Sequence, residues 1–162
     1  MKTDKIDQQV KQWRDERPDV KPEIMGLFAR LLRVNHHVTK GIWSQHKAMG
    51  LSKGDFDVLA TLRRSGNPYV LTPTDLYKSA MLTSGAITNR LDRLEKGKWV
   101  ERVHSQDDRR SFLVKLTPLG LEKIDNALSP HIENEQALSD ALTLEQKNEL
   151  DQLLKIWLTQ FE

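Results

Sequence analysis

Small and amide-bearing side chains gather on one side of a single predicted helix. Ser84, Gly85, Thr88 and Asn89 lie away from the apolar positions of residues 84–96. Side chains of this kind can approach the base edges and phosphates of a nucleic acid. Solvated surface helices carry the same residue types, so a DNA-binding role needs support from the segments that precede and follow this helix in the sequence.

Two arginines in a polar turn offer a second kind of contact. Arg109 and Arg110 follow Asp107 and Asp108, and apolar residues alternate on both sides of the turn. The alternation predicts a β-hairpin with strands at 99–104 and 111–116 and the arginines at its tip. An arginine supported by an aspartate suits a narrow, electronegative minor groove. A merely solvated turn is the competing interpretation, and a metal or general-acid role for the two aspartates has less support.

The elements that must position these side chains follow from periodicity and capping residues. A helix, a tight turn at 81–83, a second helix and a basic-tipped hairpin form a winged helix-turn-helix, whose second helix lies in the DNA major groove. The expected fold is therefore mainly α with a small β-hairpin wing. A short extra helix followed by a turn is predicted within 1–19. The other helices are predicted at 22–47, 52–64 with a Ser52–Asp55 capping box, 73–80, 84–96, 118 onward with a break or bend at Pro130, and 143–161.

We predict one domain with three functional regions. Residues 1–21 form an N-terminal extension, and residues 51–117 form the DNA-binding lobe. Residues 22–50 and 118–162 form the dimerisation helices. Large apolar side chains crowd the end of the chain, where a monomer would leave them exposed. A terminal helix folded onto its own core is the alternative.

Composition excludes several function classes. The 162 residues include no cysteine, which rules out disulfide scaffolds, thiolate zinc sites and thiol catalysis. Residues 1–120 hold 22 basic and 14 acidic residues, whereas residues 121–162 hold 3 and 9. The basic part can therefore face a polyanion.

No motif of a common enzyme or membrane protein is present. The chain has no GxGxxG, P-loop or HExxH motif, so we do not expect an enzyme or a cofactor. The apolar stretch 26–34 is broken by Arg30 and Arg33, so a cytoplasmic protein is expected. His36 and His37 are adjacent and point to different sides, which disfavours a zinc site built from them with His104 or His131.

Three motifs resemble the MarR family of bacterial transcription regulators: TPTDL at 72–76, SGAITNRLDRLEKG at 84–97 and DDRRSFLVKLTPLG at 107–120. The resemblance runs in order over about residues 22–160. It implies a homodimer with interlocked first and last helices, a pseudo-palindromic operator and repression relieved by a small ligand. The DNA-binding residues that we predict are Thr72, Thr74, Thr83, Ser84, Gly85, Ala86, Thr88, Asn89, Arg93, Asp108, Arg109 and Arg110.

A finer resemblance concerns the ligand. Trp13, Asp57, Arg90 and Arg102 resemble four residues of urate-responsive family members, with Trp13 in the added N-terminal helix. A planar anionic purine could stack on the tryptophan and bind the arginine fork of Arg102, while its charge opposes Asp57 and attracts Arg90. The structural alternative is a hydrophobic anchor, an Asp57–Arg90 ion pair and a phosphate contact by Arg102.

Two other functions remain open at this stage. A family member that responds to phenolic or other aromatic acids would use the same DNA-binding elements, with smaller roles for Trp13 and Arg102. A helical adaptor that binds another protein through its last helix would show no salt-dependent affinity for DNA.

Overall fold

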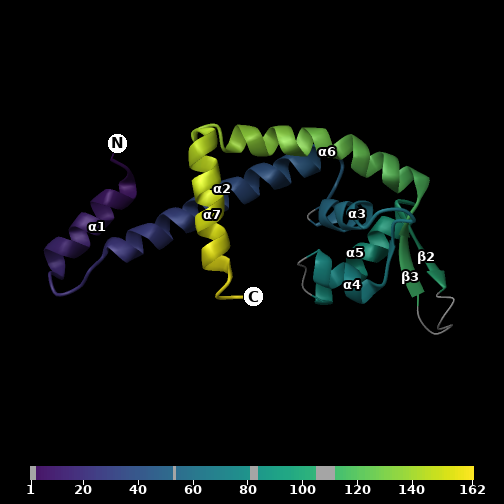
Figure 1. Cartoon of the computed structure of the whole chain (residues 1–162), viewed down its shortest axis with the longest axis horizontal. Helices are drawn as coiled ribbons and strands as arrows, with labels where there is room; N and C mark the ends of the chain where they lie inside the picture. The colour runs from purple at the N-terminus through teal and green to yellow at the C-terminus, as the bar shows by residue number, and fades with distance from the viewer. Residues whose placement is uncertain (1–2, 53, 81–83, 105–111) are drawn as a thin grey trace. The chain divides into compact units, whose positions relative to one another are not determined.

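The computed structural model describes residues 3–52, 54–80, 84–104 and 112–162, with side chains of the 84–96 helix from residue 88 onward. The chain divides into two compact units, Met1–Gly41 and Ile42–Glu162. Figure 1 traces the elements of both. In chain order they are α1 (Lys5–Glu16), α2 (Glu23–Ala48), α3 (Asp55–Arg64), β1 (Val70–Leu71), α4 (Pro73–Ser79), α5 (Ser84–Lys96), β2 (Val100–His104), β3 (Phe112–Leu116), α6 (Pro118–Leu138) and α7 (Leu144–Leu158).

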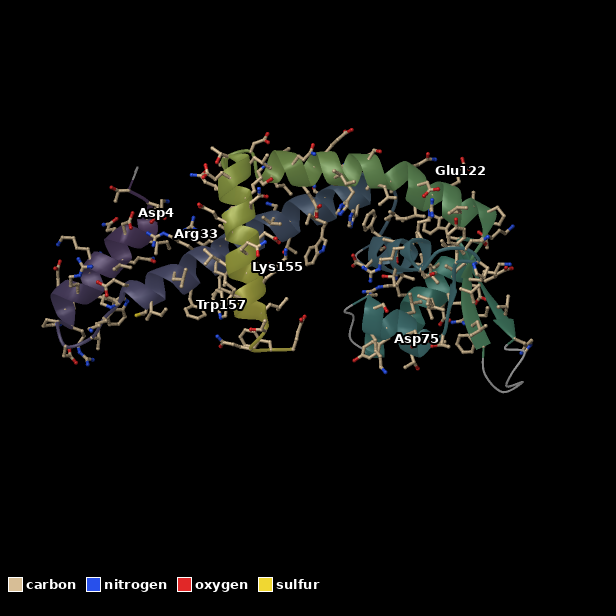
Figure 2. All side chains as sticks on the ribbon, viewed as in Figure 1. Asp4, Arg33, Asp75, Glu122, Lys155 and Trp157 are labelled. Atoms are coloured by element: carbon tan, nitrogen blue, oxygen red, sulfur yellow. The ribbon has the colours of Figure 1, made fainter. Side chains whose placement is uncertain are left out.

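The first unit pairs α1 with the first part of α2. Asp4 caps α1 in a capping box with Asp7, and Ile6 is buried. The guanidinium of Arg30 on α2 donates to the carboxylates of Asp4, at 2.9 and 3.0 Å, and Asp7, at 2.5 Å. The hydrogen bond from Arg30 lowers the pKa of Asp4 to about 2. The cap of α1 is therefore also its link to α2; Asp4 is labelled in Figure 2.

The second unit holds the main core. Leu59, Leu62, Leu76, Leu94 and Ile124 are fully buried, and they come from α3, α4, α5 and α6. Figure 1 shows α3, α4 and α5 together, beside the β2–β3 hairpin. The helix pair and hairpin predicted from the sequence are both present, so the predicted fold class is confirmed.

Among the described residues, the sheet has three strands in the order β1-β3-β2, all antiparallel. β2 and β3 pair from Val100↔Leu116 to His104↔Phe112. β1 pairs only with Lys115 and Val114 of β3. The strand β1 was not predicted, because two residues are too few to show a period of two.

Two helix predictions need correction. α3 begins at Asp55 and not at Ser52, because Gly54 precedes it with φ +79°, a left-handed conformation that glycine adopts without strain. Only half of the expected capping box forms, in which the Asp55 carboxylate accepts the Ser52 N–H at 2.8 Å. α6 continues through Pro130 to Leu138, which rules out the predicted break but not the predicted bend, although proline removes one helical hydrogen bond.

A glycine fixes the junction between the hairpin and α6. A Cβ atom at Gly120 would lie 1.8 Å from the backbone oxygen of Trp99, so only glycine fits there. The Thr117 hydroxyl accepts the Gly120 N–H at 3.0 Å and donates to the Lys98 carbonyl at 2.7 Å. The threonine and glycine of the TPLG segment therefore fasten α6 to the base of the wing. Within the described residues, no helix is long and apolar enough to cross a membrane.

Candidate nucleic-acid interface and ligand site

The start of α4 is fixed by its own side chains. The Thr72 hydroxyl accepts the Asp75 N–H at 3.0 Å and donates to the Asp75 carboxylate at 2.7 Å. This reciprocal contact caps α4 ahead of Pro73, as the sequence predicts. Thr72 is thus engaged in capping, whereas Thr74 is exposed.

α5 presents two faces, as expected for a recognition helix. Leu91 and Leu94 are buried, and Thr88 and Asn89 are exposed. Of the other predicted DNA contacts, Thr83 and the side chains of Ser84, Gly85 and Ala86 lie outside the described residues, as do Asp108, Arg109 and Arg110 at the hairpin tip.

Arg93, also predicted to contact DNA, forms an ion pair within the protein. Its guanidinium donates to both carboxylate oxygens of Asp55 at the start of α3, one of them at 3.3 Å. The Asp55 side chain is only 2 % exposed, while Arg93 is half exposed. The pair therefore connects α5 to α3 and neutralises a buried carboxylate.

Arg102 connects the hairpin to α5. From β2 its Nη2 donates to Asp92 at 2.5 Å, its Nη1 donates to Glu95, and its backbone N–H donates to Glu95 at 3.3 Å. The guanidinium also lies 5.3 Å from the ring centroid of Phe112 on β3. The hydrogen bond with Asp92 is the main reason why the pKa of Arg102 is raised.

Arg90 and Asp57 do not form the ion pair that the sequence suggests. The guanidinium of Arg90 lies against Gly54, where a Cβ atom would come within 2.4 Å of its Cζ. Its Nη1 is buried without a hydrogen-bond partner among the described residues. Asp57 is exposed, and its charge acts on His46 instead. Gly54 therefore leaves room for Arg90, which keeps one unused donor.

Trp13 belongs to the first unit, on α1, and its side chain is about half exposed. It lines a cavity of about 90 Å³ with Ile6, Val10, Met25 and Gly26 among its neighbours. An apolar cavity that holds benzene has a volume of about 150 Å³. This cavity alone is therefore too small for a bicyclic purine, but Trp13 also lines an open hollow of about 500 Å³ with Gln9, Gln12 and Glu16.

The sequence of this chain is similar to those of known transcriptional regulators. The family model described as "MarR family" matches residues 51–112, from before α3 to the first residue of β3. The chain is 37 % identical to the HTH-type transcriptional regulator PecS of Dickeya dadantii, over 90 % of this chain and 87 % of that protein. It is 31 % identical to the multiple antibiotic resistance protein MarR of Salmonella typhimurium, over 85 % of this chain and 94 % of that protein. The chain belongs to the MarR family.

A solved structure supports the same assignment for this MarR-family regulator. A crystal structure of an E. coli MarR variant complexed with operator DNA matches with a TM-score of 0.74 and 30 % identity, covering 85 % of this chain and 96 % of that one. The family consists of DNA-binding transcriptional regulators. The prediction that this protein is a DNA-binding regulator and not an enzyme is confirmed.

One cluster of buried rings in this MarR-family protein was not predicted. His46 near the end of α2 is 3 % exposed and stacks on Phe56 of α3, with ring centroids 4.4 Å apart. Its Nε2 lies 3.2 Å from Nδ1 of His131 on α6, and His131 lies 3.4 Å from Glu135. Burial, followed by the charge of His131, lowers the pKa of His46.

A signal for this cluster was present in the sequence. His46 follows Val34, Val38 and Ile42 at intervals of four, which places it on the apolar side of α2. His131 pairs with His46 and not with His36 or His37. In the described part of the chain, no group of three or more His, Asp or Glu residues is arranged to hold a metal ion.

Proposed function

We propose that this MarR-family regulator represses transcription by binding a pseudo-palindromic operator as a homodimer, and that a small aromatic anion releases it. The observation that carries the proposal is the two-faced α5, with Leu91 and Leu94 buried beneath exposed Thr88 and Asn89. A helix held in this way can enter the major groove with its polar side toward the bases.

The DNA contacts come from three places in the second unit. The start of α4, the first turns of α5 and the tip of the hairpin form the DNA-contacting surface, with the basic tip in the minor groove. Two lobes related by a two-fold axis would contact half-sites about 10 base pairs apart. The contributing residues are Thr72, Thr74, Thr83, Ser84, Gly85, Ala86, Thr88, Asn89, Arg93, Asp108, Arg109 and Arg110.

Exposed apolar surface supports the homodimer. No residue of α7 is buried, and its large apolar side chains Leu150, Leu153, Leu154, Ile156 and Leu158 are all exposed. Several large apolar side chains exposed on one short helix are typical of a protein contact. α2 exposes Ile24, Leu27, Leu32 and Val34 as well. We therefore assign the dimer contact to residues 22–50 and 118–162, with residues 1–21 as an added N-terminal extension.

The ligand is proposed to be an aromatic anion such as urate or a related purine. Trp13 supplies a ring for stacking, and Arg90 has a buried donor that an anion could satisfy. The fork of Arg102 already binds Asp92 and Glu95, so an anion must displace a carboxylate to engage it. The charge of Asp57 would repel the anion. A phenolic acid is the alternative ligand, with smaller roles for Trp13 and Arg102.

A gel-shift titration tests both levels of this proposal. The purified protein is bound at fixed salt to the DNA upstream of its own gene, and urate, xanthine and salicylate are added in turn. Release by the purines supports the ligand assignment, and release by salicylate alone replaces it with the phenolic one. The absence of a specific shift at this DNA would contradict the proposed operator.

The ligand residues are tested in the same assay with matched variants. Trp13→Ala should raise the urate concentration needed for release, while Trp13→Phe, which keeps an aromatic ring, should raise it less. If both variants release DNA at the same urate concentration as the unsubstituted protein, Trp13 does not bind the ligand.

A further inference from the structure

We infer that Arg102 is a positioning residue that holds the wing hairpin at a fixed orientation against α5. The inference rests on the proposed function, in which α5 and the hairpin contact one operator together. Arg102 is then required for DNA binding without touching DNA. This role differs from the phosphate contact and from the ligand contact considered for the same residue.

Three interactions converge on Arg102 from two neighbouring elements. Asp92 and Glu95 of α5 bind the two ends of its guanidinium, and Phe112 of β3 lies beside it. The Arg102 side chain is 27 % exposed, which is less than either carboxylate partner. Both carboxylates lie one turn apart on the same side of α5, where a planar fork can bind them together. A lysine is a point charge and cannot reproduce this geometry.

The position of Arg102 in the sheet explains why its link to α5 matters for the stability of the hairpin. Arg102 pairs with Val114 of β3, and Val114 in turn pairs with Leu71 of β1. Beyond this row, β1 has ended and the hairpin continues with only two strands, through Val103↔Leu113 and His104↔Phe112. Two-stranded ribbons have little stability of their own. Arg102 therefore anchors the wing at the last row where a third strand supports it.

Charge argues against a direct DNA contact by Arg102. Arg102 faces the two carboxylates of Asp92 and Glu95, so these three side chains together carry a net negative charge. This charge repels the phosphates of DNA. A fixed wing instead helps binding by avoiding the entropy cost of ordering a loose hairpin on the operator. The two roles predict opposite effects when the carboxylates are neutralised.

The first experiment measures hydrogen exchange in the full-length protein without DNA. In Arg102→Ala, the amides of Val103 and Leu113, which face each other across β2 and β3, should exchange about tenfold faster, while core amides such as Leu59 keep their protection. Lys115→Ala is the matched control, because it removes one positive charge from the same hairpin at the exposed Glu101 pair. If the amides of Val103 and Leu113 exchange at the same rate in Arg102→Ala as in the unsubstituted protein, the inference is overturned. This holds whether or not the protein binds DNA as proposed.

The second experiment measures operator affinity at fixed salt. Arg102→Ala should weaken binding about five- to tenfold, and Arg102→Lys should not restore it. The double variant Asp92→Asn, Glu95→Gln should also weaken binding, although it removes two negative charges. Tighter binding by this double variant, together with full activity of Arg102→Lys, would show a direct charge contact and overturn the positioning role.

A double-mutant cycle with the hairpin tip separates this inference from the proposed function. If Arg102 acts through the wing, its loss should add little to the loss already caused by Arg110→Ala. Additive losses would overturn the inference. If Arg110→Ala binds the operator normally, the proposed wing contact fails, and the hydrogen-exchange result alone decides whether Arg102 positions the hairpin.

Discussion

At the residue scale, burial decides which charged groups matter. His46 illustrates this, because its ring packs against both Phe56 and His131, whose rings also contact each other. Burial and the charge of His131 lower its pKa, while the charges of Asp57 and Glu135 act in the opposite direction. The native protein therefore favours the neutral form of His46.

This burial predicts a pH dependence of stability. Unfolded histidine has a pKa of about 6.5, so below that pH the unfolded chain binds more protons at His46 than the native protein does. The free energy of unfolding should fall as the pH drops from 6.5 toward the native pKa, at most by about 1.4 kcal/mol per pH unit. Urea unfolding at fixed protein concentration measures it.

His46→Gln should reduce this slope between pH 6.5 and 5, because it removes the buried titrating group. His104→Gln, at an exposed position of β2, is the control and should leave the slope unchanged. An equal slope in the native protein and in His46→Gln would show that His46 does not cause the pH dependence.

At the element scale, ion pairs hold α5 in place from two sides. Arg93 of α5 pairs with Asp55 of α3, and Arg102 of β2 pairs with Asp92 and Glu95 of α5. Hydrophobic contacts of Leu91 and Leu94 bury one side of the helix. The charged contacts also fix the orientation of α5 relative to α3 and β2, because a hydrogen bond depends on angle as well as distance.

The Arg93 pair predicts a loss of stability. Arg93→Ala would leave the Asp55 carboxylate buried, with the Ser52 N–H as its remaining donor. We expect the free energy of unfolding to fall by about 2 kcal/mol, less than for a fully buried pair because Arg93 is half exposed. Chemical denaturation measures the change.

Lys115→Ala is the matched control for this effect. Lys115 pairs with Glu101 at 3.3 Å, and both side chains are exposed. An exposed pair of this kind contributes less than about 1 kcal/mol. Equal losses in the two variants would contradict the importance of burial at Asp55.

At the scale of the whole molecule, the most conspicuous feature is apolar surface without a cover. Leu153 and Ile156 of α7 are 64 % and 69 % exposed. Figure 2 shows the side chains of this helix, with Lys155 and Trp157 labelled. Water contact over so much apolar area is unfavourable, and a second copy of the chain would remove it.

Charge placed on this surface should separate the proposed dimer. In Leu153→Glu, Ile156→Glu, sedimentation equilibrium should show monomers, and operator affinity should fall by more than tenfold because two half-sites are no longer bound together. Lys155→Gln is the control, since Lys155 pairs with Asp151 on the same helix. A double variant that remains dimeric would place the dimer contact elsewhere.

Local signals in the sequence determined most of the elements. Thr72, Thr117 and Thr143 each precede a helix and cap it. The alternation at 99–104 and 111–116 predicted both long strands, which begin one residue later, at Val100 and Phe112. Capping, periodicity and turn chemistry act within a few residues, so they are visible without the fold. The three motifs that resemble the MarR family lie within these same elements, so the DNA-binding elements could also be predicted from the sequence.

Only the tertiary structure decided which charged groups meet. The sequence paired Asp57 with Arg90, whereas the fold pairs Asp55 with Arg93 and Arg102 with Asp92 and Glu95. It also brings His46 to His131, which is 85 residues away. Helical spacing alone places several charged residues of one helix equally well to meet a given partner. The choice among them depends on side-chain direction and burial, which are fixed only when distant elements pack.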